Sequence, residues 1–186
     1  YVAPLGRELI CILGLGGSQG AEIFSQVVPK ALAQLPEKLH KRIRLILQGA
    51  PEAFVQGVHP SGHILEGEAA RFFHDVDVRM AQAHFVICRS GASTVAETAL
   101  LGKPTLFVPY PFAVADHQRF NALALVGQGG GWMCDQKDFT PAWLTSFLEK
   151  ILQDPEVLLK ASKSIRAQVY EDSATRLSDV VVACSA

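Results

Sequence analysis

The sequence lacks several features that would place it in a specialised class of protein. No apolar run approaches the roughly 18 residues of a membrane span, and the longest ones, 9–15 and 85–88, have the length of strands. Charge is scarce and balanced, with a net charge of −1, which argues against a general binder of nucleic acid or other polyanions. Low-complexity tracts and internal repeats are also missing. Because hydrophobic residues reach 49%, a disordered chain is excluded as well.

Cysteine is equally sparse, and its placement excludes the common metal motifs. The four cysteines form no C-x-x-C pair, and two of them, Cys11 and Cys88, lie inside apolar runs. We therefore expect buried, reduced thiols. The six histidines do not cluster with cysteines at ligand spacing, so the sequence predicts no metal site.

The length of 186 residues corresponds to about one domain. The chain opens on Tyr1 instead of methionine, and the first strand-like run begins only at Leu9. We therefore expect it to be a piece of a longer protein.

Strand-like and helix-like segments alternate along the chain. The expected strands cover residues 9–15, 43–47, 63–65, 85–88, 105–108 and 130–134. The expected helices cover 21–35, 76–83, 93–101 and 117–126, followed by two that begin after Thr140-Pro141 and Asp154-Pro155. This alternation predicts an α/β fold with a parallel sheet and helices on both faces. Such sheets bind ligands outside the carboxyl ends of their strands, so the loops there carry the candidate site.

The first such loop, residues 14–20 (GLGGSQG), joins a strand to a helix. Glycines let a ligand approach the backbone, and free N–H groups at a helix start attract anions. The loop resembles a loose dinucleotide fingerprint, but the second strand ends in Gln48-Gly49 where that fingerprint expects an acid. No Gly-Lys-Ser/Thr follows, so it is not a P-loop. A tight turn without a ligand is the alternative.

The second loop, residues 89–97 (RSGASTVAE), again leads from a strand into a helix. The N–H groups of Ala92, Ser93 and Thr94 would face a diphosphate there. Glu97 lies one helical turn after Ser93, and its carboxylate could accept two hydrogen bonds from ribose hydroxyls. Alternatively, Ser93 is an ordinary cap and Glu97 an acid that complements the helix dipole.

The third loop leads into residues 116–122 (DHQRFNA), at the start of a further helix. Gln118 and Asn121 are three residues apart and share a face, and their amides suit sugar hydroxyls. The alternative is a solvated first turn that Asp116 caps. Anion-binding backbone, a ribose carboxylate and sugar-binding amides together make up a nucleotide-sugar pocket.

These segments, in this order and spacing, resemble the C-terminal half of the MurG family, the UDP-N-acetylglucosamine transferases of bacterial peptidoglycan synthesis. The matching text is GGSQGA at 16–21, CRSGASTVAE at 88–97, GKP at 102–104 with FVP at 107–109, and DHQRFNA at 116–122. The similarity extends from about residue 10 to about residue 182.

The resemblance implies a Rossmann-like domain that forms the donor half of a two-domain GT-B glycosyltransferase. The complete enzyme would transfer GlcNAc from UDP-GlcNAc to lipid I with inversion, giving lipid II, with no metal or other cofactor. It would be a cytoplasmic protein, peripheral on the inner face of the bacterial membrane. The implied donor-binding residues are Gly17, Ser18, Gln19, Phe73, Ala92, Ser93, Thr94, Val95, Ala96, Glu97, Gln118 and Asn121. Among them, the Phe73 backbone would read uracil and Glu97 would hold the ribose.

The same resemblance implies that the acceptor site, the general base and the membrane-facing patch lie in an N-terminal domain missing from this chain. We therefore expect the chain, residues 1–186, to bind the donor and to carry no catalytic residue. Its last helices, residues 154–186, would pack toward the missing domain. Two other classes stay open: the donor subunit of another GT-B transferase, and a non-catalytic dinucleotide-binding module.

Overall fold

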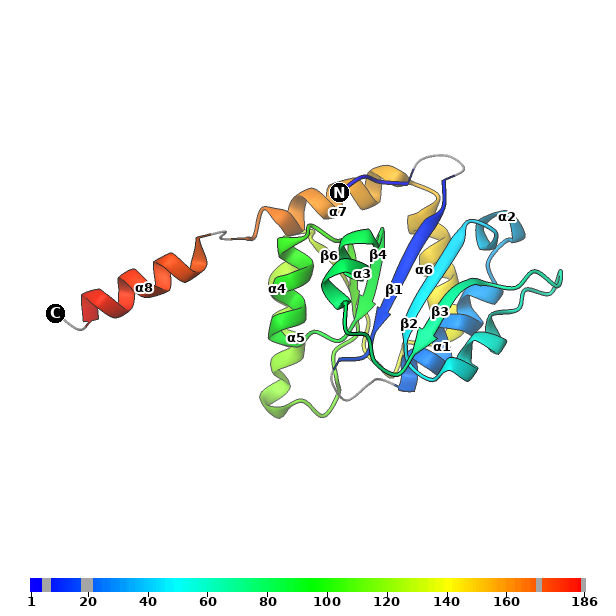
Figure 1. Ribbon diagram of the computed structural model, residues 1–186, viewed down its shortest axis with the longest axis horizontal. Helices are drawn as coiled ribbons and strands as arrows, with labels where there is room; N and C mark the ends of the chain where they lie inside the picture. The colour runs from blue at the N-terminus through cyan, green and yellow to red at the C-terminus, as the bar shows by residue number, and fades with distance from the viewer. Residues whose placement is uncertain (5–7, 18–21, 170–171, 185–186) are drawn as a thin grey trace.

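A six-stranded parallel sheet forms the centre of the molecule (Figure 1). The structure, a computed structural model, describes residues 1–4, 8–17, 22–169 and 172–184. The strands are β1 (Ile10–Leu15), β2 (Ile43–Gln48), β3 (Glu66–Ala70), β4 (Phe85–Cys88), β5 (Thr105–Phe107) and β6 (Gly131–Met133). Their order is β3-β2-β1-β4-β5-β6, and every neighbouring pair is parallel. The predicted α/β class and Rossmann-like sheet are confirmed.

Helices cover both faces of this sheet (Figure 1). They are α1 (Glu22–Ala33), α2 (Glu37–His40), α3 (Val76–Gln82), α4 (Ala92–Leu100), α5 (His117–Val126), α6 (Pro141–Leu152), α7 (Pro155–Arg166) and α8 (Ser173–Cys184), with 3₁₀ turns η1 (Pro51–Gly57) and η2 (Val114–Asp116). Helices α1 and α6 pack on one face, and α3, α4 and α5 pack on the other. No helix in the described part of the chain is both long and apolar enough to cross a membrane.

The central strand β1 shows why the sheet needs both layers. Ile10 and Ile12 belong to the core beneath α1 and α6, whereas Cys11, Leu13 and Leu15 belong to the core beneath α3 and α4. All five side chains are buried, because successive residues of a strand point to opposite faces. The predicted buried thiol at Cys11 is confirmed, and burial raises the pKa of that thiol.

The predicted third strand, 63–65, is wrong. The strand lies at Glu66–Ala70 instead, and residues 63–65 form part of the loop before it. β3 is an edge strand that pairs only with β2, so its sequence, EGEAA, is half exposed and carries no apolar run. The apolar pattern at Ile64 and Leu65 marks the approach to the strand, where Ile64 is exposed and Leu65 is buried.

The last helices begin where their caps predict. Thr140 Oγ1 accepts a hydrogen bond from the Trp143 N–H (3.2 Å), and Asp154 Oδ1 accepts one from the Glu156 N–H (3.0 Å). Helix α7 packs onto the domain through Leu158 and neighbouring apolar side chains. Helix α8 extends away from the sheet (Figure 1), which leaves the valines at 180–182 exposed.

Candidate functional site

The loops singled out from the sequence follow three neighbouring strands. At the carboxyl edge, Leu15 of β1 pairs with Cys88 of β4, and Cys88 pairs with Phe107 of β5. The Arg89 N–H donates to the Leu15 carbonyl (3.3 Å), so the turns after β1 and β4 begin side by side. The strand order reverses between β1 and β4, which is where sheets of this type open a crevice for ligands.

The glycine-rich turn after β1 is held by a side chain from the next strand. Gln48 accepts a hydrogen bond from the Gly16 N–H (3.2 Å) and donates one to the Gly17 carbonyl (3.1 Å). Gly17 has a φ of 80°, a conformation that favours glycine. The position where a dinucleotide fold places its ribose acid is thus occupied by an amide committed to the loop. Two predicted ligands, Ser18 and Gln19, lie outside the described residues.

Helix α4 begins without a side-chain cap. Gly91 is the N-cap residue, and no side chain among the described residues bonds to the first turn. Ala92 and Ser93 are exposed and Thr94 is half-buried, so the N–H groups of this turn face outward at the positive end of the helix dipole. The alternative that Ser93 is an ordinary cap is wrong, because it is the second residue of the helix.

Glu97 lies in the second turn of α4, and its side chain is exposed. The alternative that Glu97 complements the dipole from the first turn of the helix is therefore wrong. It forms no ion pair with any residue in the described ranges. The side chain lines a cavity of about 370 Å³ together with His74, which precedes α3, and with Val76 and Asp77 in the first turn of α3. The cavity is bounded further by Met80, Leu100 and Leu101.

The cavity joins Glu97 to the loop that carries Phe73. His74, the next residue, lines the cavity, while the Phe73 side chain is buried beneath the guanidinium of Arg79 at 4.0 Å. Arg79 is held in turn by Glu68 (2.5 Å) and Asp75 (2.7 Å). These contacts hold the Phe73 side chain against the guanidinium of Arg79 on α3.

Two other predicted ligands follow the uncapped turn of α4. Val95 is half-buried against the core beneath α4, so its side chain is used in packing. Ala96 is exposed.

Gln118 holds the start of α5 to the loop that precedes it, and Asn121 holds α5 to the loop after β4. The Tyr110 N–H donates to Gln118 Oε1 (3.0 Å), and Asn121 Nδ2 donates to the Ser90 carbonyl (3.1 Å). The amide nitrogen of Gln118 and the amide oxygen of Asn121 form no hydrogen bond with the described residues. The alternative of a purely solvated first turn capped by Asp116 is wrong, since Asp116 makes no side-chain cap bond and has a φ of 53°.

Reasoning from the sequence missed two residues of this site. The sequence shows Gln48 only as an amide at a position where a dinucleotide fold has an acid. It gives no indication that Arg89, directly after β4, has a role in the site. The guanidinium of Arg89 is half-buried and donates to the Val108 carbonyl (3.0 Å). No local pattern marks either role, because the partners come from distant segments.

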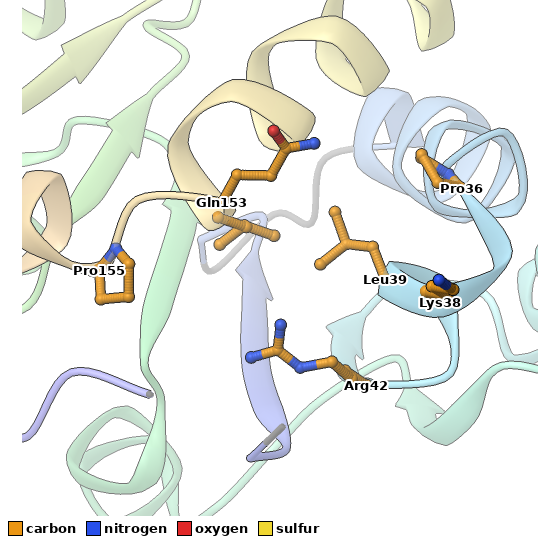
Figure 2. Close-up of a pocket in the computed structure, with 7 residues that line it drawn as sticks. Pro36, Lys38, Leu39, Arg42, Gln153 and Pro155 are labelled. Carbon is orange, nitrogen blue, oxygen red and sulfur yellow. The ribbon is translucent and has the colours of Figure 1, made fainter. Parts of the chain in front are cut away.

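A second cavity, of about 890 Å³, lies at the other end of the sheet (Figure 2). Its lining includes Lys38 and Arg42, which precede β2, and Gln153 between α6 and α7. In Figure 2, Leu39, Arg42 and Gln153 surround the opening. This cavity contains none of the predicted ligands, so the candidate site is the carboxyl edge of the sheet.

A family comparison defines the class to which this fold and site belong. The family model described as the glycosyltransferase family 28 C-terminal domain matches residues 10–177 of this chain. The chain therefore belongs to this family.

The relatives identify the particular type as MurG-like. The chain is 46% identical over 184 residues to the UDP-N-acetylglucosamine--N-acetylmuramyl-(pentapeptide) pyrophosphoryl-undecaprenol N-acetylglucosamine transferase of Paramagnetospirillum magneticum, covering 98% of this chain and 49% of that protein. It is 41% identical to the enzyme of the same name from Rhodospirillum centenum, covering 98% of this chain and 48% of that protein. The chain thus spans about half the length of the curated relatives that it matches.

Solved structures agree with this placement. Acinetobacter baumannii MurG superposes with a TM-score of 0.82 at 27% identity, covering 93% of this chain and 52% of that chain. The complex of Staphylococcus aureus MnaA with UDP has a TM-score of 0.66 at 10% identity, covering 94% and 46%, and shows the fold alone. The resemblance to the MurG family seen in the sequence is confirmed.

Proposed function

We propose that this chain is the donor-binding half of a transferase that moves GlcNAc from UDP-GlcNAc to lipid I. One observation carries the proposal: an uncapped helix start and the glycine-rich turn lie side by side, one helical turn from an exposed carboxylate in a cavity. The names of the relatives support the identity of donor and acceptor.

Each part of the donor has a matching group in the site. The N–H groups of Ala92, Ser93 and Thr94 bind the diphosphate, and Glu97 accepts hydrogen bonds from the two ribose hydroxyls. The backbone at Phe73 binds the uracil edge, inside the loop that leads to the cavity.

The same N–H groups also stabilise UDP as the leaving group of the reaction. When the bond to the sugar breaks, negative charge develops on the diphosphate. Dipoles already fixed at the start of α4 stabilise that charge without reorganising. Losing one preorganised donor of this kind typically costs about 2.7–4 kcal/mol in the transition state.

The acceptor and the membrane belong to the half of the enzyme that this chain does not span. In this proposal, lipid I and the inner face of the bacterial membrane contact that other half, and this chain contacts neither nucleic acid nor metal. Helix α8, with its exposed valines at 180–182, would pack against the other half.

Calorimetric titration of the chain with UDP, UDP-GlcNAc and NAD tests the proposal. We expect both uridine nucleotides to bind and NAD to give no heat of binding. Gln48 favours this outcome, because its amide is committed to the loop where a dinucleotide-binding fold places its ribose acid. Binding of NAD without a response to UDP would instead support a dinucleotide-binding module.

A substitution of Gln118 is expected to reduce the affinity for UDP-GlcNAc more than the affinity for UDP. Gln118→Glu keeps an oxygen for the Tyr110 N–H but removes the amide nitrogen that addresses GlcNAc. We expect the loss of affinity for UDP-GlcNAc to be about 2- to 10-fold larger than that for UDP, since one neutral hydrogen bond to the sugar is lost while the added charge acts on the diphosphate of both ligands alike. Gln128→Glu, an exposed change just beyond α5, is the matched control. Equal losses for both ligands in calorimetry would place Gln118 away from the sugar.

A further inference from the structure

Arg89 joins the loops of the candidate site at their centre. Its Nη1 donates to the carbonyls of Val108 (3.0 Å) and Pro109 (3.1 Å), and its Nη2 donates to Gln136 Oε1 (2.5 Å). These acceptors lie directly after β5 and after β6, whereas Arg89 itself follows β4. One side chain therefore fixes three neighbouring loops.

The guanidinium also lies over two aromatic rings, one of them from the first turn of α1. Its central carbon is 5.4 Å from the ring centre of Phe24, in the first turn of α1, and 5.5 Å from that of Tyr110. Arg89 is also two residues before Gly91, the N-cap of α4. The cation is thus held between the loops that follow β5 and β6 and the ring of Phe24 from the first turn of α1.

No carboxylate in the described part of the chain balances this charge. The three hydrogen-bond acceptors are neutral, and Arg89 has no ion pair with any residue in the described ranges. Burial lowers the pKa of the guanidinium, but an arginine remains charged at neutral pH. A half-buried cation without a counter-charge is costly, and an anion bound at the same edge would offset that cost.

We propose that Arg89 is a positioning residue whose unpaired charge also favours the diphosphate of the donor. This inference rests on the proposed function and adds a long-range electrostatic role to the N–H contacts. The positioning role acts through Tyr110, which follows the anchored Pro109 and donates its N–H to Gln118. The charge therefore acts on the diphosphate, and the hydrogen bonds act on the sugar.

Two substitutions separate the roles. Arg89→Met removes both the charge and the hydrogen bonds, whereas Arg89→Lys keeps the charge and loses the multidentate geometry. Uridine, UDP and UDP-GlcNAc are titrated into the whole chain by calorimetry, at low and high salt. Arg119→Met is the matched control, because that arginine is already paired with Asp135.

We expect Arg89→Met to weaken UDP by roughly 10- to 50-fold and uridine by less than about twofold, since only UDP carries the charge that Arg89 attracts. Arg89→Lys should bind UDP within about threefold of the parent chain, but lose the additional affinity for UDP-GlcNAc. The ratio of UDP to uridine affinity should depend on salt in the parent chain and much less in Arg89→Met.

Equal losses of uridine and UDP in Arg89→Met would overturn the inference and leave a purely structural arginine. If Arg89→Met does not fold, as judged by circular dichroism, Arg89→Lys decides the question: a loss of UDP affinity as large as the loss of UDP-GlcNAc affinity, or no loss of either, overturns the inference. A parent chain that binds no uridine nucleotide overturns the proposed function, and this inference with it. A parent chain that binds UDP while Arg89→Met binds it equally well overturns the inference alone.

Discussion

Replacing Glu97 by alanine is expected to weaken the binding of UDP by about 10- to 100-fold. The carboxylate is exposed in the cavity beside α3 and is committed to no ion pair in the described structure, so it is available for the ribose. Hydrogen bonds to a charged group contribute about 1.5–3 kcal/mol, and the two vicinal hydroxyls share one carboxylate. Calorimetric titration with UDP measures the loss.

The ligand itself provides the sharpest control for Glu97. UDP that lacks the 2′-hydroxyl should bind the parent chain more weakly, but should bind Glu97→Ala about as weakly as UDP does, because the two changes remove the same interaction. Asp77→Asn, on the opposite wall of the cavity, should leave the affinity for UDP nearly unchanged. A Glu97→Ala chain that binds UDP as the parent does contradicts the assignment. Stability should change little, as the side chain is exposed.

The sequence predicts those parts of the fold that are fixed by local pattern. The apolar runs of β1 and β4 are buried on both faces, and such runs are recognisable without knowledge of their neighbours. Helix α5 has the bounds that its pattern indicates, His117–Val126. The position of β3 cannot be predicted from an apolar run, because an edge strand with one partner needs none.

The residues of the candidate site are also of two kinds: those that a local motif identifies and those whose partners are distant in the sequence. A motif such as RSGASTVAE places the helix start and Glu97, since all of their geometry comes from one short segment. The role of Arg89 depends on Gln136, which is 47 residues further along the chain, and Asn121 depends on the Ser90 carbonyl, 31 residues away. The sequence contains the residues of this network, but only the folded sheet shows which of them meet.

The largest effect on stability is expected at Gly67, the second residue of β3. Its φ is 137°, and a Cβ atom there would lie 1.8 Å from the carbonyl oxygen of Leu45 on the neighbouring strand. Neither backbone can move away without breaking the pairing of Gly67 with Leu45. Gly67→Ala should therefore lower the free energy of unfolding by roughly 3 kcal/mol or more, adding a backbone clash to the usual strain of positive φ. Urea denaturation followed by circular dichroism measures the change.

Gly62→Ala separates the clash from the strain. Gly62 also has a positive φ, 86°, but a Cβ atom there meets nothing within 4 Å. That variant should lose only about 1–2 kcal/mol. If Gly67→Ala proves no less stable than Gly62→Ala, the close approach of β3 to β2 is wrong. The result also bears on the site, because β3 leads into the loop of Phe73 and His74. If β3 detaches while the rest of the sheet stays folded, Gly67→Ala should lose affinity for uridine and UDP equally, the reverse of the pattern expected for Arg89→Met.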